Sequence, residues 1–146
     1  MFFTKILFRS LITFLFLSSF AHAADSLVIK DAWSPEAPPV AKVMAGYMTI
    51  KNVSEHEVKI VSVKSKLFNK VEIHLMDMSG GMMRMIRQDN LSIKPHAQLE
   101  LTPGVLHMML IGPKKTLKTG SVIPVTFILN NNEKITTQLP VKEQAE

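Results

Sequence analysis

Apolar and polar residues alternate with a period of two along most of the chain from residue 27 onward. This period is typical of strands that turn one face to a core, and no stretch keeps a helical stripe for three turns. Short strands separated by turn residues predict a single-domain, all-β fold, an antiparallel β-sandwich or barrel with Greek-key connections. The predicted strands are 27–33, 43–53, 58–63, 70–76, 82–86, 98–101, 106–111, 121–129 and 134–139.

The N-terminal segment departs from this pattern. Lys5 and Arg9 precede a short apolar run at 11–20, and Ala21-His22-Ala23 follows with small residues at both ends. A basic start, a short apolar run and an A-x-A site are together typical of a cleaved signal peptide. The apolar run is shorter than the roughly 20 residues that a membrane-spanning helix needs. An uncleaved anchor is the alternative. We expect a signal peptide at 1–23, a β-sandwich domain at 24–141 and a short polar tail at 142–146.

Composition narrows the possible functions. With 47% apolar and 20% charged residues the chain has enough apolar matter for a core. The absence of cysteine excludes a disulfide scaffold, an iron–sulfur site, a blue-copper site and a lipid-bearing N-terminal cysteine. Without Lys5 and Arg9, 15 basic residues stand against 12 acidic ones, and the scattered lysines predict no nucleic-acid surface. No later segment is apolar enough to insert stably into a membrane. No arrangement typical of an enzyme is evident.

Two His-x-Met elements fall on predicted strands. Because successive side chains of a strand point to opposite faces, His74 and Met76 share one face of their strand, and His107 and Met109 share one face of theirs. The apolar residues between them form the opposite faces. We therefore expect His74 on the solvent side of its sheet, with Met76 beside it.

A hairpin brings a third methionine toward the first element. If the turn centres on 79–80, His74 lies directly opposite Met85, and Met76 lies opposite Met83. Directly opposed side chains have Cβ atoms about 4.5–5.5 Å apart, which lets imidazole and thioether reach one ion.

These side chains form a candidate metal site if the strand 106–111 lies near the hairpin. Thioethers are soft ligands that select Cu(I), and imidazole also suits copper, whereas zinc prefers thiolate or carboxylate and calcium requires oxygen. Such a site carries copper and offers no evident chemistry on a substrate. The predicted ligands are His74, Met85, His107 and Met109.

Simpler roles are expected for other residues of the same types. Methionine is a good gap-filler, and Met44, Met48 and Met108 lie on predicted apolar faces, so we expect them in the core. His56 and His96 lie in predicted turns and are expected to be solvated.

Four methionines near the hairpin turn have more than one possible role. Met76, Met78, Met82 and Met83 could form a second shell, a hydrophobic rim of the site or a protein-docking patch. The last reading supports an alternative function, a secreted Ig-like interaction module with a methionine-rich docking edge.

The spacing of the four candidate ligands resembles a known signature. Ten residues separate His74 from Met85, twenty-one separate Met85 from His107, and one separates His107 from Met109. This is similar to the H-x10-M-x21-H-x-M signature of the periplasmic copper chaperones of the PCu(A)C family. Four surrounding segments also resemble that family: Asp31-Ala32-Trp33, AGYMTI at 45–50, Val71-Glu72-Ile73-His74 and Leu101-Thr102-Pro103-Gly104.

The resemblance implies a cupredoxin-like β-sandwich and a Cu(I) site formed by the four candidate ligands. It also implies a periplasmic location and delivery of copper to an acceptor, such as the CuA or CuB centre of a respiratory oxidase or another copper chaperone. The tail departs from members that carry a second, Cu(II) site, because residues 140–146 contain no His or Met.

Overall fold

The structure, a computed structural model, describes residues 24–144. The predicted signal peptide lies outside the described residues. The only helical segment of the described part is the 3₁₀ turn η1 (Ser79–Gly81), and no helix there is long and apolar enough to cross a membrane. The strands are β1 (Leu27–Pro35), β2 (Val43–Asn52), β3 (Val58–Lys64), β4 (Phe68–Asp77), β5 (Arg84–Arg87), β6 (Leu91–Ile93), β7 (Gln98–Leu101), β8 (Leu106–Pro113), β9 (Val122–Leu129) and β10 (Lys134–Lys142).

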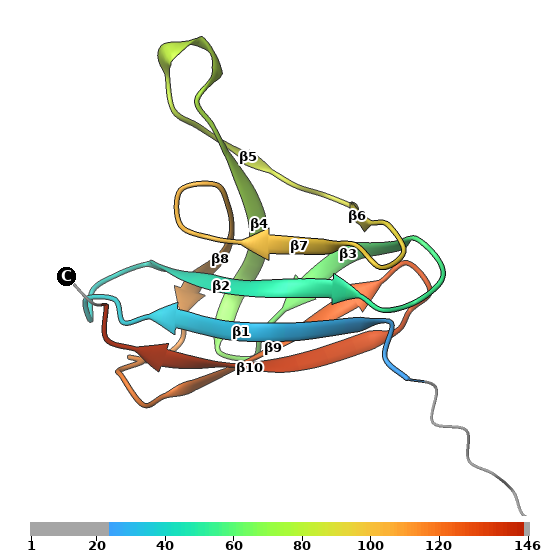
Figure 1. Cartoon of the computed structure of the whole chain (residues 1–146). Coiled ribbons are helices and arrows are strands. Elements are labelled where there is room, and N and C mark those ends of the chain that lie inside the picture. Colours follow the sequence, from blue (N-terminus) through green and yellow to red (C-terminus); the bar gives the residue numbers. More distant parts are fainter. Residues whose placement is uncertain (1–23, 145–146) are drawn as a thin grey trace, which may run out of the picture.

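The strands close into a barrel. Hydrogen-bonded neighbours run in the order β4-β8-β2-β1-β10-β9-β3, and Val63 of β3 pairs with Val71 of β4 to complete the ring. The short strands β5, β6 and β7 attach to β4, β3 and β2 (Figure 1). The predicted all-β, single-domain class is confirmed. Each predicted strand is present, and the sequence pattern missed only the three-residue β6.

One pairing differs from the predicted antiparallel arrangement. The end of β1 pairs with β10 in parallel, through Ser34 with Val141 and Pro35 with Lys142. The register of β1 against β2 shifts between Lys30 and Trp33, where Asp31 has a left-handed φ of 52°. This irregularity turns the end of β1 away from β2, so that its last residues reach β10.

The interior is filled by the apolar residues of the period-two pattern. Along β9 the buried positions alternate, and Ile123, Val125, Phe127 and Leu129 are fully buried. The core also contains Met44, Met48 and Met108, as predicted. His56 and His96 are exposed, which confirms that interpretation as well.

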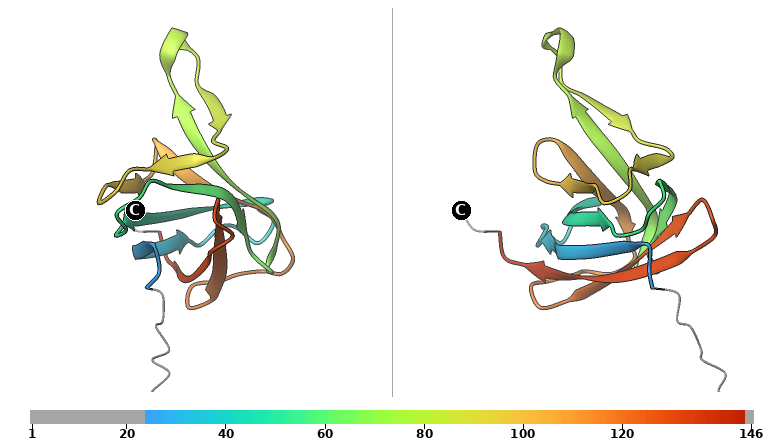
Figure 2. Two further views of the ribbon diagram at one scale, coloured as in Figure 1. Left: turned by 90° about the vertical axis from the view of Figure 1, so that its right-hand side faces the viewer. Right: turned by 45° about the vertical axis from the view of Figure 1, so that its right-hand side comes forward.

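The hairpin of β4 and β5 projects from the barrel. In Figure 1 its yellow-green tip stands clear of the other strands, and both views in Figure 2 agree. All four residues of β5 are exposed. The metal-binding candidates lie toward the base of this hairpin, on and beside β4 and β8.

A carboxylate in the β9–β10 turn attaches the start of the domain. Ser26 donates its backbone N–H to Glu133 Oε1 at 2.8 Å and its hydroxyl to Oε2 at 2.6 Å. Partial burial raises the pKa of Glu133, but the hydrogen bonds from Ser26 and Asn131 outweigh it and lower the pKa overall. These bonds stabilise the ionised carboxylate and hence the folded chain.

We expect Ser26→Ala to lower the free energy of unfolding by about 1 kcal/mol at pH 7. Because the folded pKa lies below the unfolded one, this contribution is complete above the unfolded value of about 4.3 and is lost as the pH falls through the folded pKa. Urea unfolding at pH 7 and at lower pH measures the difference. A gap between variant and native chain that widened on acidification would contradict the assignment.

Candidate metal centre

The two His-x-Met strands are direct neighbours. β4 and β8 pair antiparallel, with His74 opposite His107 and Glu72 opposite Met109. The two imidazole rings lie with their centroids 6.4 Å apart. The condition set for the candidate site, that the strand 106–111 lies near the hairpin, is therefore met.

The predicted register of the hairpin is wrong by two residues. His74 pairs with Arg87, and Met76 pairs with Met85, so neither predicted pair forms. The turn centres one residue later than expected, because Gly80 and Gly81 both adopt left-handed φ values, 79° and 77°, within the turn. Glycine takes this conformation without the steric cost that a side chain would impose.

The shift keeps Met85 on the intended face. Since strand side chains alternate, a slip of two residues preserves the face, whereas a slip of one would reverse it. Met85 is the diagonal neighbour of His74 across the pair, at a typical Cα distance of about 7–8 Å. Met85 takes the position directly opposite Met76 that the sequence pattern assigned to Met83.

A pocket of about 300 Å³ opens on this face of the sheet. Three of the four predicted ligands, Met85, His107 and Met109, line it, and Met76 lines it as well. The other lining residues are Val43, Met44, Ala45, Tyr47 and Gly104. The fourth predicted ligand, His74, lies beside His107 with its ring Nε2 toward Glu72.

The remaining hairpin methionines lie away from the pocket. Met83 follows the turn, beyond the last hairpin pair of Asp77 with Arg84, and does not line the pocket. Met78, Met82 and Met83 are all exposed. Met76 therefore lines the pocket and Met83 does not, and the role of either residue as a second shell or rim stays a prediction.

The histidine face is more enclosed than predicted. His107 is 8% exposed and the His74 side chain 14%, so neither stands on an open solvent face. β4 and β8 lie between β5 and β2, whose side chains on the same face include Met85 and Tyr47. Met85 itself is 47% exposed and leaves one side of the pocket accessible.

Glu72 is a polar residue of this face that the sequence analysis did not assign. Its carboxylate is 9% exposed and is surrounded by cations: Lys70 contacts Oε1, and Arg87 Nη1 donates to Oε1 at 2.9 Å. His74 Nε2 lies 2.8 Å from Oε2. Hydrogen bonds from Lys70 and then from His74 hold the pKa of Glu72 below its usual value. The period-two pattern of the strand could have indicated this residue, because it places Glu72 on the same face as His74.

The donor set fits a soft metal ion. Among residues 24–144, no three His, Asp or Glu side chains converge into a metal site of the kind that zinc or calcium requires. His74 Nδ1 is buried without a hydrogen-bond partner in this part of the chain. A buried imidazole nitrogen without a partner, on a strand face that also carries Met76, matches the ligand preference of Cu(I).

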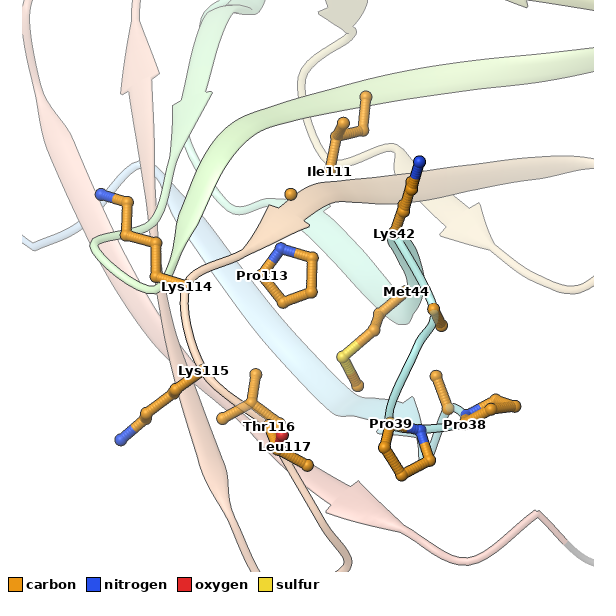
Figure 3. Close-up of a pocket in the computed structure, with 13 residues that line it drawn as sticks. Pro38, Pro39, Lys42, Met44, Ile111, Pro113, Lys114, Lys115, Thr116 and Leu117 are labelled. Carbon is orange, nitrogen blue, oxygen red and sulfur yellow. The ribbon is translucent and has the colours of Figure 1, made fainter.

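A larger cavity lies beyond the end of β8. It encloses about 480 Å³ between the loop before β2 and the segment that follows β8 (Figure 3). Its walls are mostly apolar, with Lys42, Lys114 and Lys115 at the edge and Met44 as its one sulfur-bearing residue. It has no imidazole or carboxylate, so metal binding is assigned to the smaller pocket.

The chain is similar to copper-binding domains of known structure. The copper-bound PCuAC domain of PmoF2 superposes with a TM-score of 0.69 at 20% identity, over 84% of this chain and 97% of that domain. The Cu(I) form of DR1885 from Deinococcus radiodurans superposes with a TM-score of 0.67 at 28% identity, over 88% of this chain and 85% of that protein.

Sequence comparison agrees with this class of all-β domain. A family model described as LpqE-like matches residues 27–141, and the chain belongs to this family. The predicted PCu(A)C resemblance is thereby confirmed.

Two further proteins are similar to this chain in sequence. "Uncharacterized protein RP573" of Rickettsia prowazekii is 28% identical over 89 residues, which are 60% of this chain and 49% of that protein. The match therefore spans about half the length of that relative. "Putative lipoprotein Lxx21020" of Leifsonia xyli subsp. xyli is 25% identical over 121 residues, 82% of this chain and 72% of that protein.

Proposed function

We propose that this protein is a periplasmic Cu(I)-binding metallochaperone whose ligands are His74, Met85, His107 and Met109. The observation that carries the proposal is the pairing of His74 with His107 beside a pocket lined by Met85 and Met109. The similarity to a structure of Cu(I)-DR1885, at 28% identity, supports copper as the metal. The domain limits of 24–141 and a cupredoxin-like, Greek-key description of the fold are part of this proposal.

The proposed mechanism is ligand exchange. Two imidazole nitrogens and two thioether sulfurs are neutral donors that bind Cu(I). Such neutral ligands leave the ion more readily than a thiolate does. The half-exposed Met85 gives an acceptor access to the ion, so that incoming ligands can replace these one at a time. Met76, directly opposite Met85, supplies an additional thioether during exchange.

The partner follows from this role. A copper carrier requires an acceptor with its own copper ligands, such as the CuA or CuB centre of a respiratory oxidase or another copper chaperone. We propose transfer to such a protein, with no catalytic step, no nucleic-acid ligand and no stable membrane insertion of the mature chain.

Export is proposed through a cleaved signal peptide at 1–23. The family description and one relative carry the word lipoprotein, which agrees with an exported protein. The sequence contains no cysteine to which a lipid of that kind could be attached. We therefore propose export of the mature chain without a lipid on an N-terminal cysteine.

Anaerobic competition titration with a Cu(I) chelator tests the function. We expect tight binding of one Cu(I) per chain, because the pocket holds one group of soft donors. Absence of Cu(I) binding by the folded chain would refute the proposal. A partner that bound equally well with and without copper would favour the interaction-module alternative, for which the exposed hairpin methionines would be the contact surface.

We expect Met85→Leu to weaken Cu(I) binding without abolishing it. Leucine keeps the apolar bulk but removes one of four donors, so the loss should be at least the roughly tenfold that even an outer-shell change costs. The same titration measures it. Met82→Leu, at a position 72% exposed, serves as the matched control and should keep native affinity. Equal affinities for both variants would remove Met85 from the ligand set.

A further inference from the structure

The carboxylate of Glu72 is a charged group in a buried position, which is unfavourable unless the charge is paired. It is almost fully buried on the histidine face, and three side chains donate to it: Lys70, Arg87 and His74. The lysine and arginine side chains are themselves more than half exposed. Buried ion pairs contribute little net stability, because desolvation offsets the attraction. The contact with His74 is the one that reaches the candidate metal site.

This contact determines which nitrogen of His74 carries the proton. A carboxylate accepts hydrogen bonds and cannot donate them, so Nε2, 2.8 Å from Glu72 Oε2, must be the N–H of the neutral ring. Nδ1 then carries the free lone pair. Within residues 24–144 it is buried and has no hydrogen-bond partner. A buried polar atom without a partner is unfavourable, and such atoms often belong to functional sites.

The position of Glu72 also sets the direction of the lone pair. Glu72 precedes His74 by two residues on the same face of β4, so Nε2 points back along the strand. The lone-pair directions of the two ring nitrogens diverge, so Nδ1 cannot face Glu72 while Nε2 donates to it. The next residue on this face of β4 is Met76, whose partner on β5 is Met85. In metal sites, a carboxylate on one ring nitrogen commonly orients the other nitrogen as the ligand.

We propose that Glu72 is a positioning residue that holds His74 in its Nε2–H form, so that Nδ1 is the nitrogen that binds Cu(I). The inference rests on the proposed copper function and adds to it the atom that binds and the residue that selects it. On this view His74 needs no rotation when copper enters, because the hydrogen bond to Glu72 is kept.

Nitrogen-15 NMR of the histidine rings tests the assignment directly. In the metal-free chain at neutral pH, we expect His74 to give a protonated Nε2 and an unprotonated Nδ1. On anaerobic addition of Cu(I), the Nδ1 signal should shift strongly while Nε2 stays protonated. An Nδ1–H ring in the metal-free chain, or binding of copper through Nε2, would overturn the proposal.

Substitution of Glu72 gives an independent readout. Glu72→Ala should weaken Cu(I) binding about 10–100-fold and should mix the two ring forms of His74. Glu72→Gln keeps an oxygen that accepts from Nε2, so it should restore the native ring form and part of the affinity. Native affinity and an unchanged ring form in Glu72→Ala would refute the role.

Glu100→Ala is the matched control, because it removes an exposed carboxylate from β7 and should leave both readouts unchanged. If the alanine variant fails to fold, the glutamine variant and the spectrum of the unmodified chain still decide. Failure of the unmodified chain to bind Cu(I) would refute the proposed function, whereas the ring form of the metal-free chain tests Glu72 separately.

Discussion

Replacing His74 and His107 together by alanine is expected to abolish tight Cu(I) binding. The two rings face each other across β4 and β8 and are the only imidazoles near the pocket in the described part of the chain. Without them, Cu(I) keeps only thioethers, which are weaker donors on the half-exposed side of the site. The loss of affinity should exceed the roughly 10–100-fold that follows from changing an outer-shell residue. Anaerobic competition titration measures it.

A matched double variant tests whether the removal of any two histidines would lower the Cu(I) affinity. His56→Ala with His96→Ala removes two exposed rings from loops and should keep native affinity. Thermal unfolding should confirm that both double variants are folded. If the variant lacking all four predicted ligands retained full Cu(I) affinity, the site would have to be sought elsewhere.

Phe127→Ala is expected to have the largest effect on stability. Phe127 is fully buried in β9, paired with Val63 on one side and Ile135 on the other. Truncation removes the ring from the middle of the barrel and leaves a cavity that the strands on either side cannot close. Such changes typically cost about 3–5 kcal/mol. Urea unfolding followed by circular dichroism measures this loss.

Two controls sharpen the stability measurement. Val40→Ala, at a position 88% exposed, should change the free energy of unfolding by no more than about 0.5 kcal/mol. Met108→Leu, in the core next to the candidate ligand Met109, should cost less than about 1.5 kcal/mol and leave Cu(I) binding intact. A Phe127→Ala chain as stable as the Val40→Ala chain would contradict the central place of β9 in the core.

Local pattern accounted for the elements and for the faces of the strands. Period two located nine of the ten strands, since burial on one face imposes alternation on each strand separately. The same rule put Met108 in the core and Met109 on the opposite face, where the structure has it lining the pocket. It failed for β6, because three residues are too few to establish a period.

The local sequence pattern predicted the pairing register between two strands less reliably than the strands themselves. The turn between β4 and β5 contains two glycines, and both are left-handed, so the sequence allowed more than one register. The face of Met85 was correct because the shift was even, but its opposite residue was not. Turn geometry selects the register, and a flexible turn leaves it undetermined until the surrounding strands pack.

By itself, the sequence determined the strands, the core faces and the types of donor atom that the candidate site contains. Only the tertiary structure decided that β8 lies directly beside β4, which sets His74 opposite His107 although more than thirty positions separate them. It also decided that Glu72 lies 2.8 Å from Nε2 of His74 and that both side chains are largely buried. The physical reason is that alternation depends on each strand and its environment alone. Neighbours across a barrel depend on how all the strands pack together.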